Sequence, residues 1–85
     1  SWRKCPKITV LGNEVSSNLS DLADSLENVE YDVEIITRKK GSSGSPIALK
    51  IGGSQTSEII DSIENSAAPL RTKKGSDNTA IIRYR

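Results

Sequence analysis

The chain of 85 residues contains no histidine, no phenylalanine, no methionine and only one cysteine, Cys5. Histidine is the side chain that titrates nearest neutral pH and most often moves protons or binds metals, so its absence removes many catalytic schemes. A single cysteine forms neither an internal disulfide nor a zinc site. We therefore expect a protein that is not an enzyme and that holds no metal and no cofactor.

Long hydrophobic runs are also absent. No uninterrupted apolar stretch exceeds three residues, whereas a membrane-spanning helix needs about twenty, so we expect no association with a membrane. The lone thiol favours a reducing cytoplasm over an oxidising compartment. A periplasmic location stays open, because a periplasmic chain can also carry one cysteine.

The core must be built from isoleucine, leucine, valine and alanine, because the aromatic residues are one tryptophan and two tyrosines. A chain of this length forms one small domain, which buries about 60–65 % of its unfolded surface. We predict a single domain over residues 1–85, with residues 1–6 as a flexible N-terminal segment.

Charge is distributed unevenly, although the net charge is only +1. Residues 8–37 hold seven acidic residues and no basic one. From residue 38 onward there are nine basic residues against four acidic ones. The molecule is therefore predicted to be electrically two-sided.

The chain nearly repeats itself. Residues 24–28 (DSLEN) return as 61–65 (DSIEN), and residues 37–42 (TRKKGS) are echoed by 71–76 (RTKKGS). This internal repeat predicts that a helix end, an extended stretch and a basic glycine turn are each used twice. The same pattern is also typical of a de novo protein, in which one design procedure chooses the same residues for similar local structures.

Hydrophobic periodicity predicts two helices and at least four strands. The helices are predicted over residues 18–28 and 55–66, where apolar residues recur every three or four positions. Strands are predicted over residues 7–12, 31–37, 47–51 and 79–85, with Pro46 in the first position of the third. Ser16, Ser17 and Asn18 are candidate caps of the first helix, and Ser54 or Thr56 of the second.

This order, β-α-β-β-α-(β)-β, predicts an α+β fold. Two helices of modest length cover only one face of a sheet. We expect a two-layer sandwich with both helices on one face of a mostly antiparallel sheet of four to five strands, of the ferredoxin-like or split βαβ type. The opposite sheet face is expected to be open to solvent. The residues predicted on it include Thr9, Glu34, Ala48, Lys50, and Arg83 or Ile81.

Two basic turns supply the candidate site residues. These are Arg38, Lys39 and Lys40 in the first turn and Arg71, Lys73 and Lys74 in the second. If residues 67–78 form a plain loop, all six cations meet at one end of the sandwich. If residues 69–72 form a strand, the second turn moves to the opposite end and the clusters separate. Aligning the two copies of the repeat favours the strand. Lysines on glycine turns also serve simply to keep hairpin tips soluble.

The element order resembles the RNA recognition motif, and residues 8–13 (ITVLGN) are similar to the first-strand motif of that family. The family stacks bases on aromatic residues of its first and third strands, where this chain has Thr9 and the ring-free run 47–51. Tyr84 is the one plausible stacking ring on a strand. The resemblance implies a nucleic-acid binder that contacts the phosphate backbone of the nucleic acid in a salt-sensitive way.

Regulatory domains of the ACT type share the order of elements, and bind amino acids at the loop that corresponds to residues 12–13.

A second resemblance covers most of the chain. Residues 19–36 followed by 47–82 are similar in spacing to the short N-terminal domains of secretins and TonB-dependent transducers, whose order is strand, helix, two strands, helix, two strands. That resemblance implies no catalytic role and a function in protein contacts in the bacterial periplasm. The glycine common after each helix of those domains is replaced here by Val29-Glu30 and Ala68-Pro69.

Taken together, the sequence predicts a non-enzymatic protein-interaction or assembly module. Its open sheet face, an edge strand or its basic turns are expected to contact an acidic protein. The alternative is an atypical nucleic-acid-binding domain in which the same turns contact RNA or DNA phosphates. A third possibility is a designed protein without biological activity.

Overall fold

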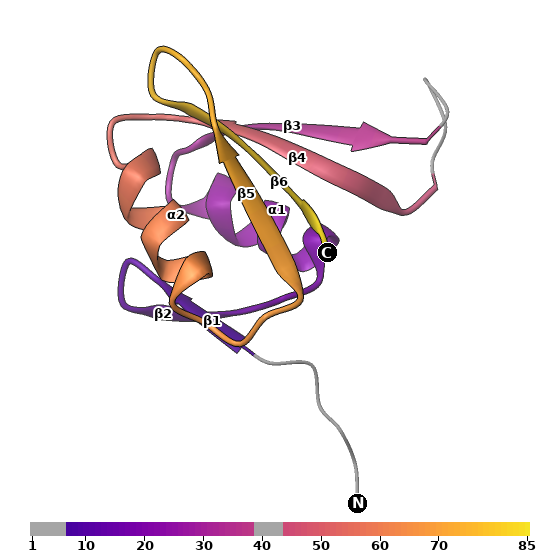
Figure 1. Cartoon of the computed structure of the whole chain (residues 1–85), viewed down its shortest axis with the longest axis horizontal. Coiled ribbons are helices and arrows are strands. Elements are labelled where there is room, and N and C mark those ends of the chain that lie inside the picture. The colour runs from indigo at the N-terminus through magenta and orange to yellow at the C-terminus, as the bar shows by residue number, and fades with distance from the viewer. Residues whose placement is uncertain (1–6, 39–43) are drawn as a thin grey trace, which may run out of the picture.

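The computed structural model describes residues 7–38 and 44–85 and contains two helices and six strands within them (Figure 1). The elements are β1 (Lys7–Val10), β2 (Asn13–Ser16), α1 (Leu19–Asn28), β3 (Asp32–Thr37), β4 (Pro46–Gly52), α2 (Thr56–Glu64), β5 (Leu70–Lys74) and β6 (Thr79–Tyr84). The predictions for residues 1–6, which include Cys5, and for Lys39 and Lys40 lie outside the described residues.

The strands form two antiparallel sheets, so the chain has an α+β fold. β1 and β2 make a two-stranded sheet, and the other four strands lie in the order β3-β4-β6-β5. The predicted single sheet was wrong in its membership, because the first predicted strand pairs with β2 and not with the larger sheet. The ferredoxin-like arrangement is therefore not confirmed.

A two-residue turn explains this difference. Leu11 and Gly12 both have positive φ, 51° and 84°, as in the tight turns that return a strand directly onto its neighbour. Residues 13–16 therefore pair with β1, with Ile8 opposite Val15. Both of these side chains are buried, which gives the hairpin one apolar face.

α1 begins where the sequence predicted. The side chain of Asn18 accepts hydrogen bonds from the backbone N–H groups of Ser20 (2.8 Å) and Asp21 (3.3 Å). The Tyr84 hydroxyl accepts another from the N–H of Leu19 (2.9 Å). Three of the N–H groups that a helix start leaves without intrahelical partners are thus satisfied.

α2 begins differently. Its N-cap residue is Gln55, whose side chain makes no capping hydrogen bond, so the predicted cap by Ser54 or Thr56 was wrong. Thr56 points inward instead and is buried. Its hydroxyl lies 2.8 Å from the carbonyl oxygens of both Gly53 and Asn78. It therefore ties the start of α2 to the turn before β6.

Both helices contact the four-stranded sheet, and the β1–β2 hairpin packs against the helices on the side away from that sheet (Figure 1). α1 contacts β2, β3 and β4, whereas α2 contacts β1, β5 and β6. The core residues between these elements are almost all aliphatic. Those that are fully buried include Ile8, Leu19, Leu22, Leu26, Leu49, Ile51, Ile59, Ile63, Leu70 and Ile82.

The internal repeat corresponds to two α-β-β units. We call α1, β3 and β4 the first unit and α2, β5 and β6 the second. The buried helix positions recur at the constant spacing that relates Asp24 to Asp61. They are Leu19, Leu22, Ala23 and Leu26 in α1 and Thr56, Ile59, Ile60 and Ile63 in α2. The predicted edge strand at 69–72 is confirmed as β5, at the place that β3 occupies in the first unit.

Candidate functional site

The four-stranded sheet has one face that does not pack on the helices. Alternation along the strands puts Leu49, Ile51, Ala80 and Ile82 on the helix side, where they are buried. The strand register assigns the other side to Glu34, Ile36, Ala48, Lys50, Arg71, Lys73, Ile81 and Arg83. We call this the open face. Of the residues predicted on it, Thr9 was wrong because β1 is not part of this sheet.

Four cations gather on the open face, and we call Lys50, Arg71, Lys73 and Arg83 the basic face. Arg71 lies directly opposite Arg83 across the β5–β6 ladder, and Lys73 lies opposite Ile81. Ile81 in turn lies opposite Lys50. Like charges directly opposite each other destabilise a sheet. The pair Arg71–Arg83 is therefore repulsive. Within the sheet, the residues opposite Arg71 and Lys73 are Arg83 and Ile81, and neither is a carboxylate.

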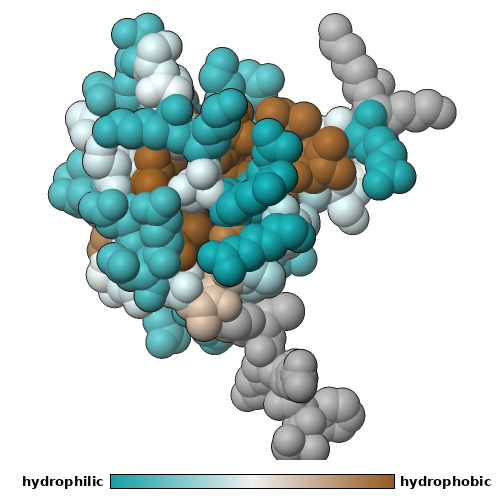
Figure 2. Space-filling model, in the orientation of Figure 1, coloured by the Kyte–Doolittle hydropathy of each residue, from teal (hydrophilic) through white to brown (hydrophobic). Residues whose placement is uncertain are grey.

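A shallow hollow marks the outer part of the basic face. It has a volume of about 320 Å³ and is lined by Arg71, Thr72, Lys73 and Arg83. Its position beside β5 matters because β5 is an edge strand of the sheet. Figure 2 shows hydrophilic side chains over β5 beside a hydrophobic area over β3 and β4.

The opposite edge of the sheet is acidic. β3 is the other edge strand, and Asp32 and Glu34 on it are exposed. Glu34 lies opposite Lys50. We call Asp32 and Glu34 the acidic edge. Ile35 follows Glu34 in the same strand, and its side chain lies on the helix side and is 47 % exposed. The open face thus changes from negative to positive between its two edges.

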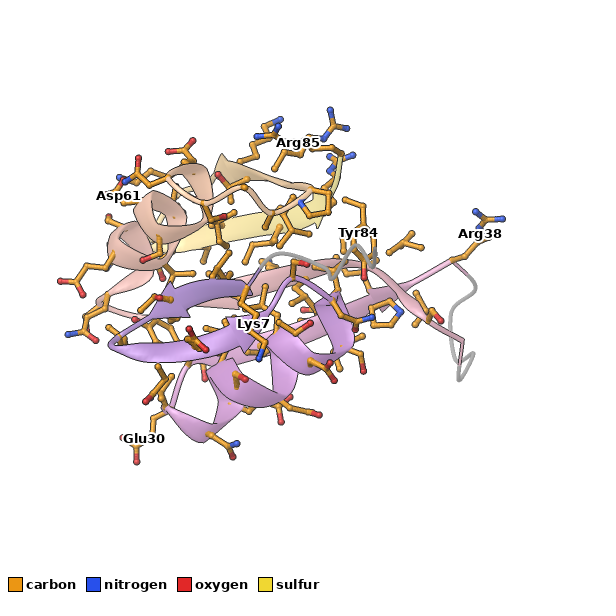
Figure 3. The ribbon with its side chains drawn as sticks, turned by 90° about the horizontal axis from the view of Figure 1, so that it is seen from below. Lys7, Glu30, Arg38, Asp61, Tyr84 and Arg85 are labelled. Carbon is orange, nitrogen blue, oxygen red and sulfur yellow. The ribbon has the colours of Figure 1, made fainter. Side chains whose placement is uncertain are left out.

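The described members of the six predicted cations, which are Arg38, Arg71, Lys73 and Lys74, do not form one rim. Arg38 follows β3 at the end of the sheet where Thr37 pairs with Pro46, and its side chain points away from the body (Figure 3). The second turn lies beyond Lys74 at the other end. Because residues 70–74 form a strand, the turn after Lys74 and Arg38 lie at opposite ends of the sheet, as predicted for that case. Among the described members, the open face brings together Arg71 and Lys73.

Lys50 and Arg83 complete the basic face, and sequence reasoning did not group them with the turns. Strand alternation alone assigns each of them to the open face. The β4–β6 register is what puts Arg83 opposite Ala48 and beside Lys50. That register depends on contacts between residues far apart in the sequence.

Tyr84 does not serve as a stacking ring on the open face. It lies opposite Leu70, which is buried on the helix side, and its hydroxyl holds the first N–H of α1 (Figure 3). The other described aromatic residue, Tyr31, is buried. Within residues 7–38 and 44–85, the open face therefore carries no aromatic ring.

The part of the chain that the structure describes holds no group of three or more residues suited to bind a metal ion. None of its helices is long and apolar enough to cross a membrane.

Tyr31 has a raised pKa, caused mainly by burial and further by the negative charge of Glu58. Its hydroxyl donates to the side chain of Gln55 (3.5 Å), so the group is part of the packing between the two units.

Comparison of the chain with models of known protein families, with curated proteins and with solved structures finds no match.

Proposed function

We propose that the protein is an interaction module that binds an acidic, extended protein segment along β5 and the basic face. The observation that carries this proposal is the opposition of Arg71 and Arg83 at β5, the edge strand of the sheet that the described residues form. An acidic strand placed there would bring carboxylates beside cations that have none opposite them. In this proposal the helices and the larger sheet form a two-layer sandwich, and the open face of the sheet is the side that a partner contacts.

The backbone of β5 supports binding by strand addition. Gly75 donates its N–H to the carbonyl of Thr79 (2.8 Å), which puts the odd-numbered residues of β5 in hydrogen bonds with β6. The even-numbered residues, including Leu70 and Thr72, therefore direct their N–H and C=O groups away from the sheet. The carbonyl of Leu70 accepts a hydrogen bond from Nε of Arg85 (3.0 Å), so Thr72 and the N–H of Leu70 are the groups that a partner can reach without displacing that side chain. An extended peptide can pair with these groups, while its side chains reach the basic face.

A peptide titration tests the proposal. The probe is a fluorescein-labelled peptide of alternating glutamate and valine, followed by fluorescence anisotropy at low salt. Arg71→Gln is expected to weaken binding about tenfold, because it removes one of the two open-face cations on the edge strand β5. The matched control is Lys7→Gln, which removes one exposed cation from β1 and should leave binding unchanged.

Two further probes separate strand addition from simple charge attraction. A peptide with proline in place of each valine keeps the charge but cannot pair its backbone along the edge, so it should bind more weakly. A single-stranded oligonucleotide tests the alternative that the basic face contacts phosphates. Tighter binding of the oligonucleotide, with steep salt dependence, would favour a nucleic-acid function. Absence of peptide binding at low salt would rule out the proposed function.

A further inference from the structure

The four-stranded sheet ends in two edge strands of opposite charge. β3 carries the acidic edge, and β5 carries Arg71 and Lys73. All neighbouring strands are antiparallel, so β3 and β5 run in opposite directions. A second copy placed beside the first by translation alone would set its β3 antiparallel to β5 and keep its helices on the same side.

The outward backbone groups of β3 fit such a junction. Gly53 donates its N–H to the carbonyl of Asn78 (3.2 Å), which continues the β4–β6 ladder and assigns the odd-numbered residues of β4 to β6. The even-numbered residues of β4 then bond to β3. By the alternation of an antiparallel ladder, the N–H and C=O groups of Val33 and Ile35 point out of the sheet.

One register matches both edges. Its opposed pairs are Asp32–Lys73, Val33–Thr72, Glu34–Arg71 and Ile35–Leu70. The first and third of these pairs join opposite charges on the open face. The second and fourth join residues whose backbone groups point outward on both strands. Val33 and Thr72 can exchange hydrogen bonds directly. In the pair Ile35–Leu70 the N–H of Leu70 can donate, whereas its carbonyl already accepts from Nε of Arg85 (3.0 Å) and becomes a full partner only when that side chain releases it. Ile35, which is exposed in the single chain, would lie beside the buried Leu70.

We propose that the acidic partner of β5 is the β3 edge of a second copy of this chain, so that copies join head to tail through one continuous sheet. This inference rests on the proposed function, since it names the occupant of the same basic edge. Charge disfavours the alternatives, because β3 against β3 opposes carboxylates and β5 against β5 opposes cations. A head-to-tail contact closes into a ring or grows into a filament.

Charge reversal tests this junction by sedimentation velocity over a range of protein concentrations at low salt. Glu34→Lys and Arg71→Glu each set like charges across it and are expected to weaken self-association about tenfold or more. An equimolar mixture of the two variants should associate like the wild type, because each junction again joins opposite charges. The double variant in one chain should do the same. Lys7→Glu is the control for a reversed charge outside the junction and should change nothing.

Folding is monitored separately, because Glu34→Lys also opposes Lys50 within the sheet. Thermal unfolding by circular dichroism reports whether each variant folds. Glu34→Gln is the milder variant, which removes the attraction without adding repulsion, and should weaken association less than Glu34→Lys.

Cross-linking gives a second measurement of the register. A carbodiimide joins a carboxylate directly to an amine that it contacts. Asp32 and Lys73 lie on opposite edges of one sheet, so a bond between them reports contact between copies. Mass spectrometry of the wild-type oligomer is expected to identify this pair, and Arg71→Glu should deplete it.

The outcomes separate this inference from the proposed function. A wild-type chain that stays monomeric at every concentration overturns the head-to-tail junction, and if it still binds the acidic peptide, the proposed function stands. A chain that neither self-associates nor binds the acidic peptide overturns both proposals. Association without rescue in the mixed variants also overturns the junction. Competition between the peptide and self-association supports both.

Discussion

The two α-β-β units bury the same positions but present opposite charges at their edge strands. At the spacing that relates Asp24 to Asp61, Glu34 of β3 corresponds to Arg71 of β5. Each lies on the open face of an edge strand. The apolar pattern recurs because each unit must cover the sheet with one helix face. The exposed positions carry no such constraint, and their divergence gives one molecule two complementary edges.

The units also differ in how they are joined. Tyr31, just before the first edge strand, corresponds to Ala68, just before the second. Both are buried, but the ring of Tyr31 reaches Gly53 in the segment that connects β4 to α2. The first unit therefore packs directly against the beginning of the second. This joint is where the comparison between the units can be broken most severely.

The largest effect is expected from Gly53→Ala. Gly53 has φ of +146°, and a Cβ atom there would lie 3.0 Å from Cδ1 and 3.2 Å from Cε1 of Tyr31. Tyr31 is only 8 % exposed, so its ring has little freedom to move away. Backbone strain and steric overlap are expected to lower the free energy of unfolding by about 2–4 kcal/mol. Urea unfolding followed by circular dichroism measures this change.

Gly52→Ala is the matched control for that substitution. A Cβ atom at Gly52 would lie 3.7 Å from Cγ2 of Thr79, which is an ordinary contact. The expected change in stability is within about 0.5 kcal/mol. Similar losses from the two alanines would contradict the role assigned to the Tyr31 ring.

A smaller effect should separate the two helix starts. Asn18 caps α1 through two backbone N–H groups, whereas Gln55 makes no such bond at α2. Asn18→Ala is expected to lower the free energy of unfolding by about 1 kcal/mol. Gln55→Ala should cost much less, because it loses only the long hydrogen bond from Tyr31. Equal costs in chemical denaturation would show that the two units are capped alike.

Most of the larger sheet and both helices could be predicted because their signals are local. The apolar stripe from Leu19 to Leu26 defines α1, and alternation around Leu49 defines β4. The repeat supplied β5, which its own residues indicate only weakly. β2 was missed because Val15 is its one apolar residue, and because leucine at the first position of a positive-φ turn is not a typical hairpin signal.

The basic face could be predicted only in part, for a physical reason. Alternation indicates which side of its strand each residue occupies, so the positions of Glu34 and Lys50 followed from the sequence. Which strands become neighbours depends on pairing between distant segments. The opposition of Arg71 and Arg83 follows from that pairing, whereas the helix-side position of Tyr84 follows from alternation with Arg83.

The smallest effect concerns pH and the joint between the units. Burial, and then the charge of Glu58, raise the pKa of Tyr31 in the folded chain, so the native state favours the protonated phenol. The unfolded chain releases this proton near the ordinary pKa of about 10. Stability should therefore be unaffected below that pH and should fall as the pH rises through the raised pKa.

Chemical denaturation on both sides of pH 10 should show this loss in the wild type and a flatter profile in Tyr31→Phe. Glu58→Gln removes the second cause and should make the loss smaller, because it reduces the difference between the folded and unfolded pKa. A wild-type profile that runs parallel to that of Tyr31→Phe would mean that the Tyr31 hydroxyl is solvated, and that the first unit does not pack on the second as tightly as its burial indicates.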